Sequence, residues 1–150
     1  MKLQFKNNLT TILTLFLFIG VNNAQTHCDS LNYIVKGYIN NIESEHMFIS
    51  DGQVYKTFIH EDEVAEFKTT LYGGMTYRIA GSAGNDDNYL IFEIEDQDRN
   101  ALFSNENYAN APYWDFKIEN TIDCYIKARL DLNKKISGCT LIMIGFERSY

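Results

Sequence analysis

The sequence has few of the residues from which enzyme active sites are built. Its three histidines are His27, His46 and His60, and none of them lies near a serine or cysteine in a nucleophile motif. Where the chain alternates as strands do, aspartate and glutamate keep to the polar phase, so the inward carboxylate pair that a glycosidase needs is also missing. We therefore predict that the protein is not an enzyme, and a small secreted hydrolase is its least supported function.

Runs of basic residues are missing as well. The 150 residues include 13 lysines and arginines against 20 aspartates and glutamates. Without Lys2 and Lys6, which belong to an export signal, eleven bases remain and the formal net charge is −9. A chain of this balance has no patch that could neutralise phosphates, which argues against nucleic acid and against anionic membrane surfaces as partners.

Only one long apolar run is present, and it lies near the N-terminus. Lys2 and Lys6 come before the apolar residues 9–21, and residues 22–25 place a small residue before a polar one, as signal peptidase requires. The run is shorter than the roughly 20 apolar residues that cross a bilayer. We predict a cleaved signal peptide over residues 1–25. The mature chain is then secreted or periplasmic, without membrane insertion.

Proline occurs once, at Pro112, whereas ten tyrosines and ten phenylalanines favour strands. Residues 28–42 carry an apolar stripe at helical spacing, so residues 26–50 are expected to form an N-terminal amphipathic helix and a connector. Period-two alternation with turn residues between segments predicts an antiparallel β-sandwich over residues 51–150. Its expected strands are residues 53–60, 64–71, 75–80, 89–95, 101–104, 113–119, 122–130 and 139–146.

These strands carry a resemblance to a known family. The order Leu71-x-Gly-Gly-x-Thr-Tyr-Arg-Ile, then Leu90-x-Phe-x-Ile-x-Asp, and finally Ser137-Gly-Cys-x-Leu resembles the bacterial pre-peptidase C-terminal domain over roughly residues 64–146. The resemblance implies a jelly-roll-like sandwich in an extracytoplasmic setting. The chain departs from the family because it has no peptidase part and adds a helix in front. No catalytic residue is implied.

One acidic turn has the spacing of a calcium loop. Asp96, Asp98 and Asn100 alternate so that three oxygens could converge on a calcium ion. The following residues return directly to a strand and do not complete an EF-hand loop. An acidic hairpin turn is the alternative, and calcium is the only cofactor that the sequence suggests.

Exposed aromatic residues offer a second kind of site. Tyr108 and Tyr113 are candidates for stacking on a sugar ring, with Tyr125 as a further one, and asparagines near residue 108 could bind hydroxyls. Ordinary packing on a half-exposed sheet face is the alternative reading of the same tyrosines.

In an oxidising compartment, three cysteines suggest one disulfide and one leftover thiol. If residues 122–130 and 139–146 formed a hairpin, Cys124 and Cys139 would lie some 15–20 Å apart. A disulfide allows only about 4.4–6.8 Å between Cα atoms. Cys28 is therefore expected to be one partner, with Cys28–Cys139 slightly favoured and Cys28–Cys124 left open.

The sequence thus predicts a secreted, non-catalytic β-sandwich that serves as a binding or accessory module for an unknown protein or glycan. The alternative is a calcium-stabilised carbohydrate-binding protein.

Overall fold

The computed structural model describes residues 22–40, 46–84 and 88–148, with side chains from Cys28 onward. Most of the predicted signal peptide therefore lies outside the described residues. The elements, in chain order, are α2 (Asn22–Ile39), β1 (Phe48–His60), β2 (Ala65–Leu71), β3 (Met75–Ser82), β4 (Leu90–Glu95), β5 (Ala101–Ser104), the 3₁₀ turn η1 (Asn105–Tyr108), β6 (Tyr113–Ile118), β7 (Ile122–Leu130) and β8 (Ser137–Glu147). No helix among these elements is long and apolar enough to cross a membrane.

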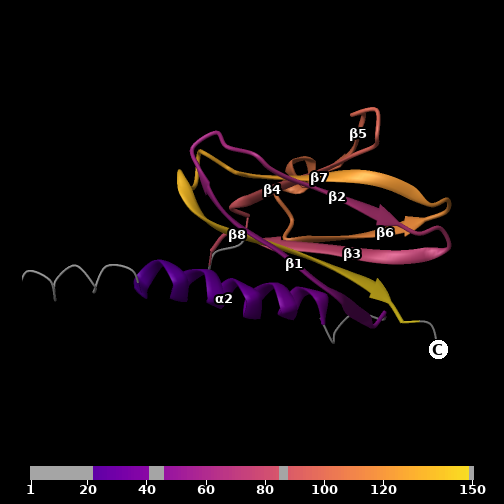
Figure 1. Cartoon of the computed structure of the whole chain (residues 1–150), viewed down its shortest axis with the longest axis horizontal. Coiled ribbons are helices and arrows are strands. Elements are labelled where there is room, and N and C mark those ends of the chain that lie inside the picture. The colour runs from indigo at the N-terminus through magenta and orange to yellow at the C-terminus, as the bar shows by residue number, and fades with distance from the viewer. Residues whose placement is uncertain (1–21, 41–45, 85–87, 149–150) are drawn as a thin grey trace, which may run out of the picture.

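The eight strands form two antiparallel sheets that pack face to face (Figure 1). Sheet A has the order β1-β8-β3-β6, and sheet B has the order β2-β7-β4-β5. The chain crosses between the sheets repeatedly, which gives the strand order of an eight-stranded jelly roll. The predicted mainly-β sandwich is confirmed.

The main core lies between the two sheets. Leu90, Phe92 and Ile94 of β4 point into it, together with Ile126 and Leu130 of β7, and all five are buried. The side chains between them, such as Glu93, point to the outer face of sheet B. Because successive side chains of a strand point to opposite faces, this alternation in the sequence specifies which face of each strand is buried.

A second core lies on the outer face of sheet A, where α2 packs (Figure 1). Leu31, Val35 and Ile39 of the helix bury themselves against Leu141 and Met143 of β8. Strand β8 is therefore buried on both faces, which explains why residues 139–144 read as a nearly continuous apolar run and not as an alternation.

The predicted boundaries differ most from the structure at the helix and at the start of β1. The helix begins at Asn22, within the predicted signal peptide, and ends at Ile39, whereas the sequence predicted residues 28–42. Strand β1 begins at Phe48, so it includes the turn predicted at residues 50–53. That turn is present as a bulge between Ser50 and Val54, with Gly52 at a φ of 86°.

The predicted hairpin of residues 122–130 with 139–146 is wrong. Strand β7 pairs with β2 and β4 in sheet B, whereas β8 pairs with β1 and β3 in sheet A. The favoured disulfide is nevertheless confirmed: Cys28 and Cys139 are bonded, with a Cα–Cα distance of 5.4 Å. Cys139 faces the helix, and Cys124 faces the core between the sheets, so sheet A separates Cys124 from Cys28.

Candidate functional site

The predicted calcium loop connects β4 to β5 as a tight hairpin turn. The carboxylate of Asp96 accepts hydrogen bonds from the backbone N–H and the side-chain amide of Asn100, both at 2.8 Å. Because Asn100 acts as a donor to Asp96, the two side chains bind each other and do not present oxygens to one point. Asp98 is exposed at the tip of the turn. Calcium binding stays a prediction that this geometry does not favour.

The hydrogen bonds of this turn make its stability depend on pH. The side-chain and backbone hydrogen bonds from Asn100 lower the pKa of Asp96 from its ordinary value. A lowered folded-state pKa stabilises the fold above the unfolded pKa of about 4, and this stability is lost as the pH falls through the folded-state pKa. Asp96→Asn cannot ionise. We expect the melting temperatures of wild type and Asp96→Asn to differ at pH 6 and to converge near about pH 2. A difference that stays constant over this range would contradict the ionised turn.

The two predicted sugar-binding tyrosines lie on opposite sides of β6. Tyr113 points toward the helix, where its ring lies 6.1 Å from that of Tyr38 and 4.5 Å from the guanidinium carbon of Arg78. Tyr108 is half exposed and packs over Trp114 at 4.2 Å between ring centres. The structure therefore does not bring the two tyrosines to one surface, and each is partly used in packing. Tyr125, the third candidate, lies under the guanidinium of Arg99 at 3.7 Å.

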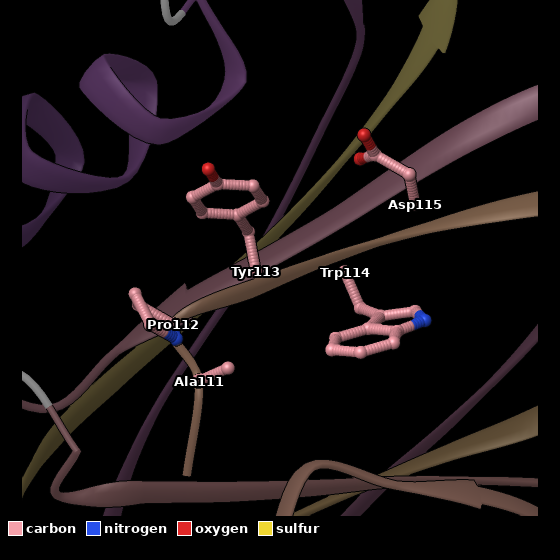
Figure 2. Close-up of a pocket in the computed structure, with 5 residues that line it drawn as sticks. All are labelled: Ala111, Pro112, Tyr113, Trp114 and Asp115. Carbon is pink, nitrogen blue, oxygen red and sulfur yellow. The ribbon is translucent and has the colours of Figure 1, made fainter. Parts of the chain in front are cut away.

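An open depression of about 530 Å³ runs along β6 and is lined by residues 111–115. Figure 2 shows Tyr113 and Asp115 projecting to one side of the strand and Trp114 to the other. Asp115 is held by Arg78, whose Nε and Nη2 donate to its carboxylate at 2.7 and 2.8 Å. The depression is thus bordered by two aromatic side chains on opposite sides of β6, one carboxylate and the backbone of an edge strand.

The described residues contain no group of three or more histidine, cysteine or acidic side chains that could hold a metal ion. The remaining free thiol is a poor nucleophile, because burial raises the pKa of Cys124 to about 11, with a smaller contribution from the charge of Asp123. His46 and His60 each lie beside a glutamate, Glu147 and Glu61 respectively, on the exposed surface.

The outer face of sheet B is charged but neutralises itself. Its bases and acids alternate across the strands at ion-pair distances, with Arg99–Glu66 at 2.5 Å, Lys127–Glu95 at 2.6 Å and Arg129–Glu106 at 2.6 Å. A partner that approached this face would have to replace pairs that already exist, and it would gain little from charge complementarity. We therefore look elsewhere for a binding surface.

Two connections meet at one end of the sandwich, at the left in Figure 1. Residues 61–64 link β1 to β2, and residues 131–136 link β7 to β8; together we call them the loop end. Both connections cross from one sheet to the other, and the backbone N–H of Glu61 donates to the carbonyl of Ile136 at 2.7 Å. Segments some seventy residues apart in the sequence thus form one surface.

The loop end exposes large apolar side chains. Val64, Leu132 and Ile136 are 52%, 50% and 64% exposed. None of them is needed to fill the core, since the strands on either side already supply inward residues. Exposed apolar residues that gather on loops and are bordered by polar residues are typical of protein-binding surfaces.

The acidic residues 61–63 of the loop end are available to a partner, whereas its lysines and Asp131 are already bound within the fold. Lys134 donates to the carbonyl of Asn88 at 3.0 Å and lies 3.5 Å from Asp131. Lys135 donates to the carbonyl of Ala83, and burial lowers its pKa.

Glu61, Asp62 and Glu63, in contrast, are exposed and have no lysine or arginine partner in the described ranges. The sequence predicted a solvated turn at these residues. It missed the exposed Leu132 and Ile136, although large apolar residues inside a predicted loop were a signal that could have found them.

No protein-family model matches this sequence, and no curated protein matches it either. Among solved structures, the chain is similar to the crystal structure of PliG, a periplasmic lysozyme inhibitor of g-type lysozyme, from Aeromonas hydrophila. The identity is 8% and the TM-score 0.50, and the match covers 65% of this chain and 90% of that chain. This likeness shows a shared fold. The resemblance to the pre-peptidase C-terminal domain stays a prediction.

Proposed function

We propose that this chain is an exported, non-catalytic module that binds a protein through the loop end. The observation that carries the proposal is the combination of exposed Val64, Leu132 and Ile136 with the exposed carboxylates of residues 61–63, which have no lysine or arginine partner among the described residues. Apolar residues supply binding energy when water is excluded from them, and a charged rim guides the encounter and selects the partner.

Export is supported by two independent features. The N-terminal residues have the pattern of a signal peptide, and Cys28 is joined to Cys139 by a disulfide, which persists in oxidising compartments. PliG, whose fold is similar, is a periplasmic protein. These features agree with a module that meets its partner outside the cytoplasm.

The partner is expected to carry a basic surface beside an apolar recess, because the loop end offers the complementary features. A g-type lysozyme is the first candidate, since the protein of similar fold is an inhibitor of that enzyme. The proposal for this chain depends on the surface and the fold together, and the direct test is binding.

A charge reversal in the loop end should weaken binding. Asp62 is exposed and makes no ion pair with a described residue, so Asp62→Lys should leave the fold intact. We expect it to lower the affinity for g-type lysozyme by about 3–10-fold and to reduce the dependence of binding on salt. The measurement is a titration followed by calorimetry or by inhibition of cell-wall lysis.

The matched control for this titration is Asp98→Lys. It makes the same change of charge at the exposed tip of the β4–β5 turn, which is at the opposite end of β4. Ile136→Ser removes an apolar anchor without touching a charge, and we expect a loss of about tenfold. Equal affinities for wild type, Asp62→Lys and Ile136→Ser would place binding outside the loop end.

The carbohydrate-binding alternative has weaker support. Sugar rings bind to open aromatic faces, and the faces of Tyr113 and Tyr125 are occupied by the guanidinium groups of Arg78 and Arg99. Of the three candidate tyrosines, Tyr108 alone keeps about half of its surface exposed.

A further inference from the structure

We propose that the exported chain forms a symmetric dimer in which the β6 edges of two copies pair antiparallel, with Asp115 of each copy opposite Lys117 of the other. The proposal goes beyond the binding of a protein by the loop end, and it uses a different surface. It rests on the free edge of β6, on the direction of its backbone groups and on the order of its charges.

The edge of β6 is open. Among the described strands, β6 pairs with β3 alone, and it is the last strand of sheet A. The N–H of Gly81 donates to the carbonyl of Pro112, and the N–H of Gly74 donates to that of Ile118. Because the backbone groups of a strand alternate in direction, those of the even-numbered residues 112–118 face β3. Those of Tyr113, Asp115 and Lys117 therefore face outward, ready to pair with another strand.

The charges on this edge select one register. In an antiparallel pair of identical strands, outward-facing residues lie opposite outward-facing residues. A two-fold axis at Asp115 would place this carboxylate opposite itself, and an axis at Lys117 would place that ammonium opposite itself. An axis at Phe116 places Asp115 opposite Lys117 twice. Opposite charges stabilise a cross-strand pair and like charges destabilise it. An axis at Ile118 would also oppose Lys117 to Glu119, but β6 ends at Ile118, so that register would pair residues beyond the strand. The axis at Phe116 is the one that opposes unlike charges within β6.

The two charged side chains differ in what they offer to this contact. Asp115 would accept Lys117 of the second copy beside its existing bonds from Arg78, so each new pair adds less than a pair between two unpartnered charges would. Lys117 is exposed and has no carboxylate partner within the residues that the structure describes. Asp115 is 37% exposed at its side chain, and two hydrogen bonds from Arg78 fix its orientation. An orientation that is already fixed lowers the entropy lost on association.

The remaining side chains agree with the same register. Phe116 would face its own copy across the axis, and Trp114 would lie opposite Ile118 of the second copy, so apolar residues meet on the other face of the strand. The depression lined by residues 111–115 would receive residues 117–121 of the second copy. The contact would add about four backbone hydrogen bonds and remove an unprotected edge from solvent.

The molar mass of the exported, disulfide-bonded protein in solution, measured over a range of concentrations, tests the proposal. The contact is small, so we expect a dissociation constant between about 10 µM and 1 mM, measured by sedimentation equilibrium. Lys117→Glu replaces two attractive pairs by two repulsive ones, and we expect it to raise the dissociation constant by about 30-fold. Lys117→Arg keeps the charge and should leave the constant within about threefold of wild type.

Amide hydrogen exchange supplies a readout inside the same strand. The amides of Asp115 and Lys117 should exchange fast in dilute protein and become protected at high concentration. The amides of Trp114 and Phe116, which bond to β3, should be protected at both concentrations. A wild-type chain that stays monomeric up to about 1 mM would overturn the proposal. A dimer that still forms in Lys117→Glu would also overturn it. So would a dimer whose formation leaves the amide hydrogen exchange of Asp115 and Lys117 unchanged.

Discussion

Replacing Arg78 by alanine is expected to lower the free energy of unfolding by about 3–5 kcal/mol. The side chain of Arg78 is only 3% exposed, and its guanidinium lies between the rings of Phe48 at 4.1 Å and Tyr113 at 4.5 Å. It donates to both oxygens of Asp115 and, at 3.1 Å, to the carbonyl of Tyr38 near the end of α2. One side chain thus joins the helix to β1 and β6.

The loss is large because several groups depend on the same guanidinium. Without it, the carboxylate of Asp115 and the carbonyl of Tyr38 lose their donors, and the two aromatic rings border a cavity. Arg78→Lys keeps the charge but not the planar bidentate geometry, so it should recover only part of the stability. Urea denaturation followed by circular dichroism gives these free energies.

Arg129→Ala is the matched control for Arg78→Ala. Arg129 is also an arginine paired with carboxylates, but its side chain is 34% exposed on the outer face of sheet B. We expect a loss of no more than about 1 kcal/mol, because solvent screens such pairs. Equal losses at the two arginines would show that Arg78 does not hold the helix on the sheet.

Removing the disulfide is the second change with a large expected effect. The Cys28–Cys139 bond joins residues 111 apart in the sequence, and in the chain-entropy model a loop of this length corresponds to about 4–5 kcal/mol. We expect the double variant Cys28→Ala/Cys139→Ala to lose about 2–5 kcal/mol of unfolding free energy. The amides of α2 should then exchange faster than those of the strands, since the helix loses its covalent link to β8.

Cys124→Ala separates the bond from the loss of a sulfur atom. Cys124 is buried and free, so this variant removes a thiol from the core and leaves the disulfide in place. A loss of about 1–2 kcal/mol is expected from the small cavity. If Cys28→Ala/Cys139→Ala were no less stable than Cys124→Ala, the disulfide would not be what holds α2 against β8.

Alternation in the sequence was enough to predict the eight strands and the core-facing side chains of β4, β6 and β7. It was not enough to predict their neighbours, because alternation specifies the face of a strand and says nothing about its partner. The wrong hairpin of residues 122–130 with 139–146 has this origin, since in a jelly roll consecutive strands often cross to the opposite sheet. The disulfide was predicted correctly although the hairpin used to argue for it does not exist.

The candidate site could be predicted less well than the fold. Asp96 and Asn100 have calcium-like spacing, but spacing does not reveal that one side chain donates to the other. The loop end depends on residues 61–64 and 131–136 lying side by side, which only the order of strands in the two sheets establishes. Nor could the sequence show that the basic side chains on the outer face of sheet B form ion pairs with neighbouring acids, whereas Asp62 forms no ion pair with a described residue.

The central claim is that the loop end binds a protein, and a binding titration of the exported chain against g-type lysozyme tests it most directly. We expect saturable binding with a dissociation constant at or below about 10 µM at physiological salt, weakened by Asp62→Lys and Ile136→Ser and unchanged by Asp98→Lys. No binding up to about 100 µM would contradict this partner, and binding that ignores Asp62→Lys and Ile136→Ser would contradict the loop end as the surface.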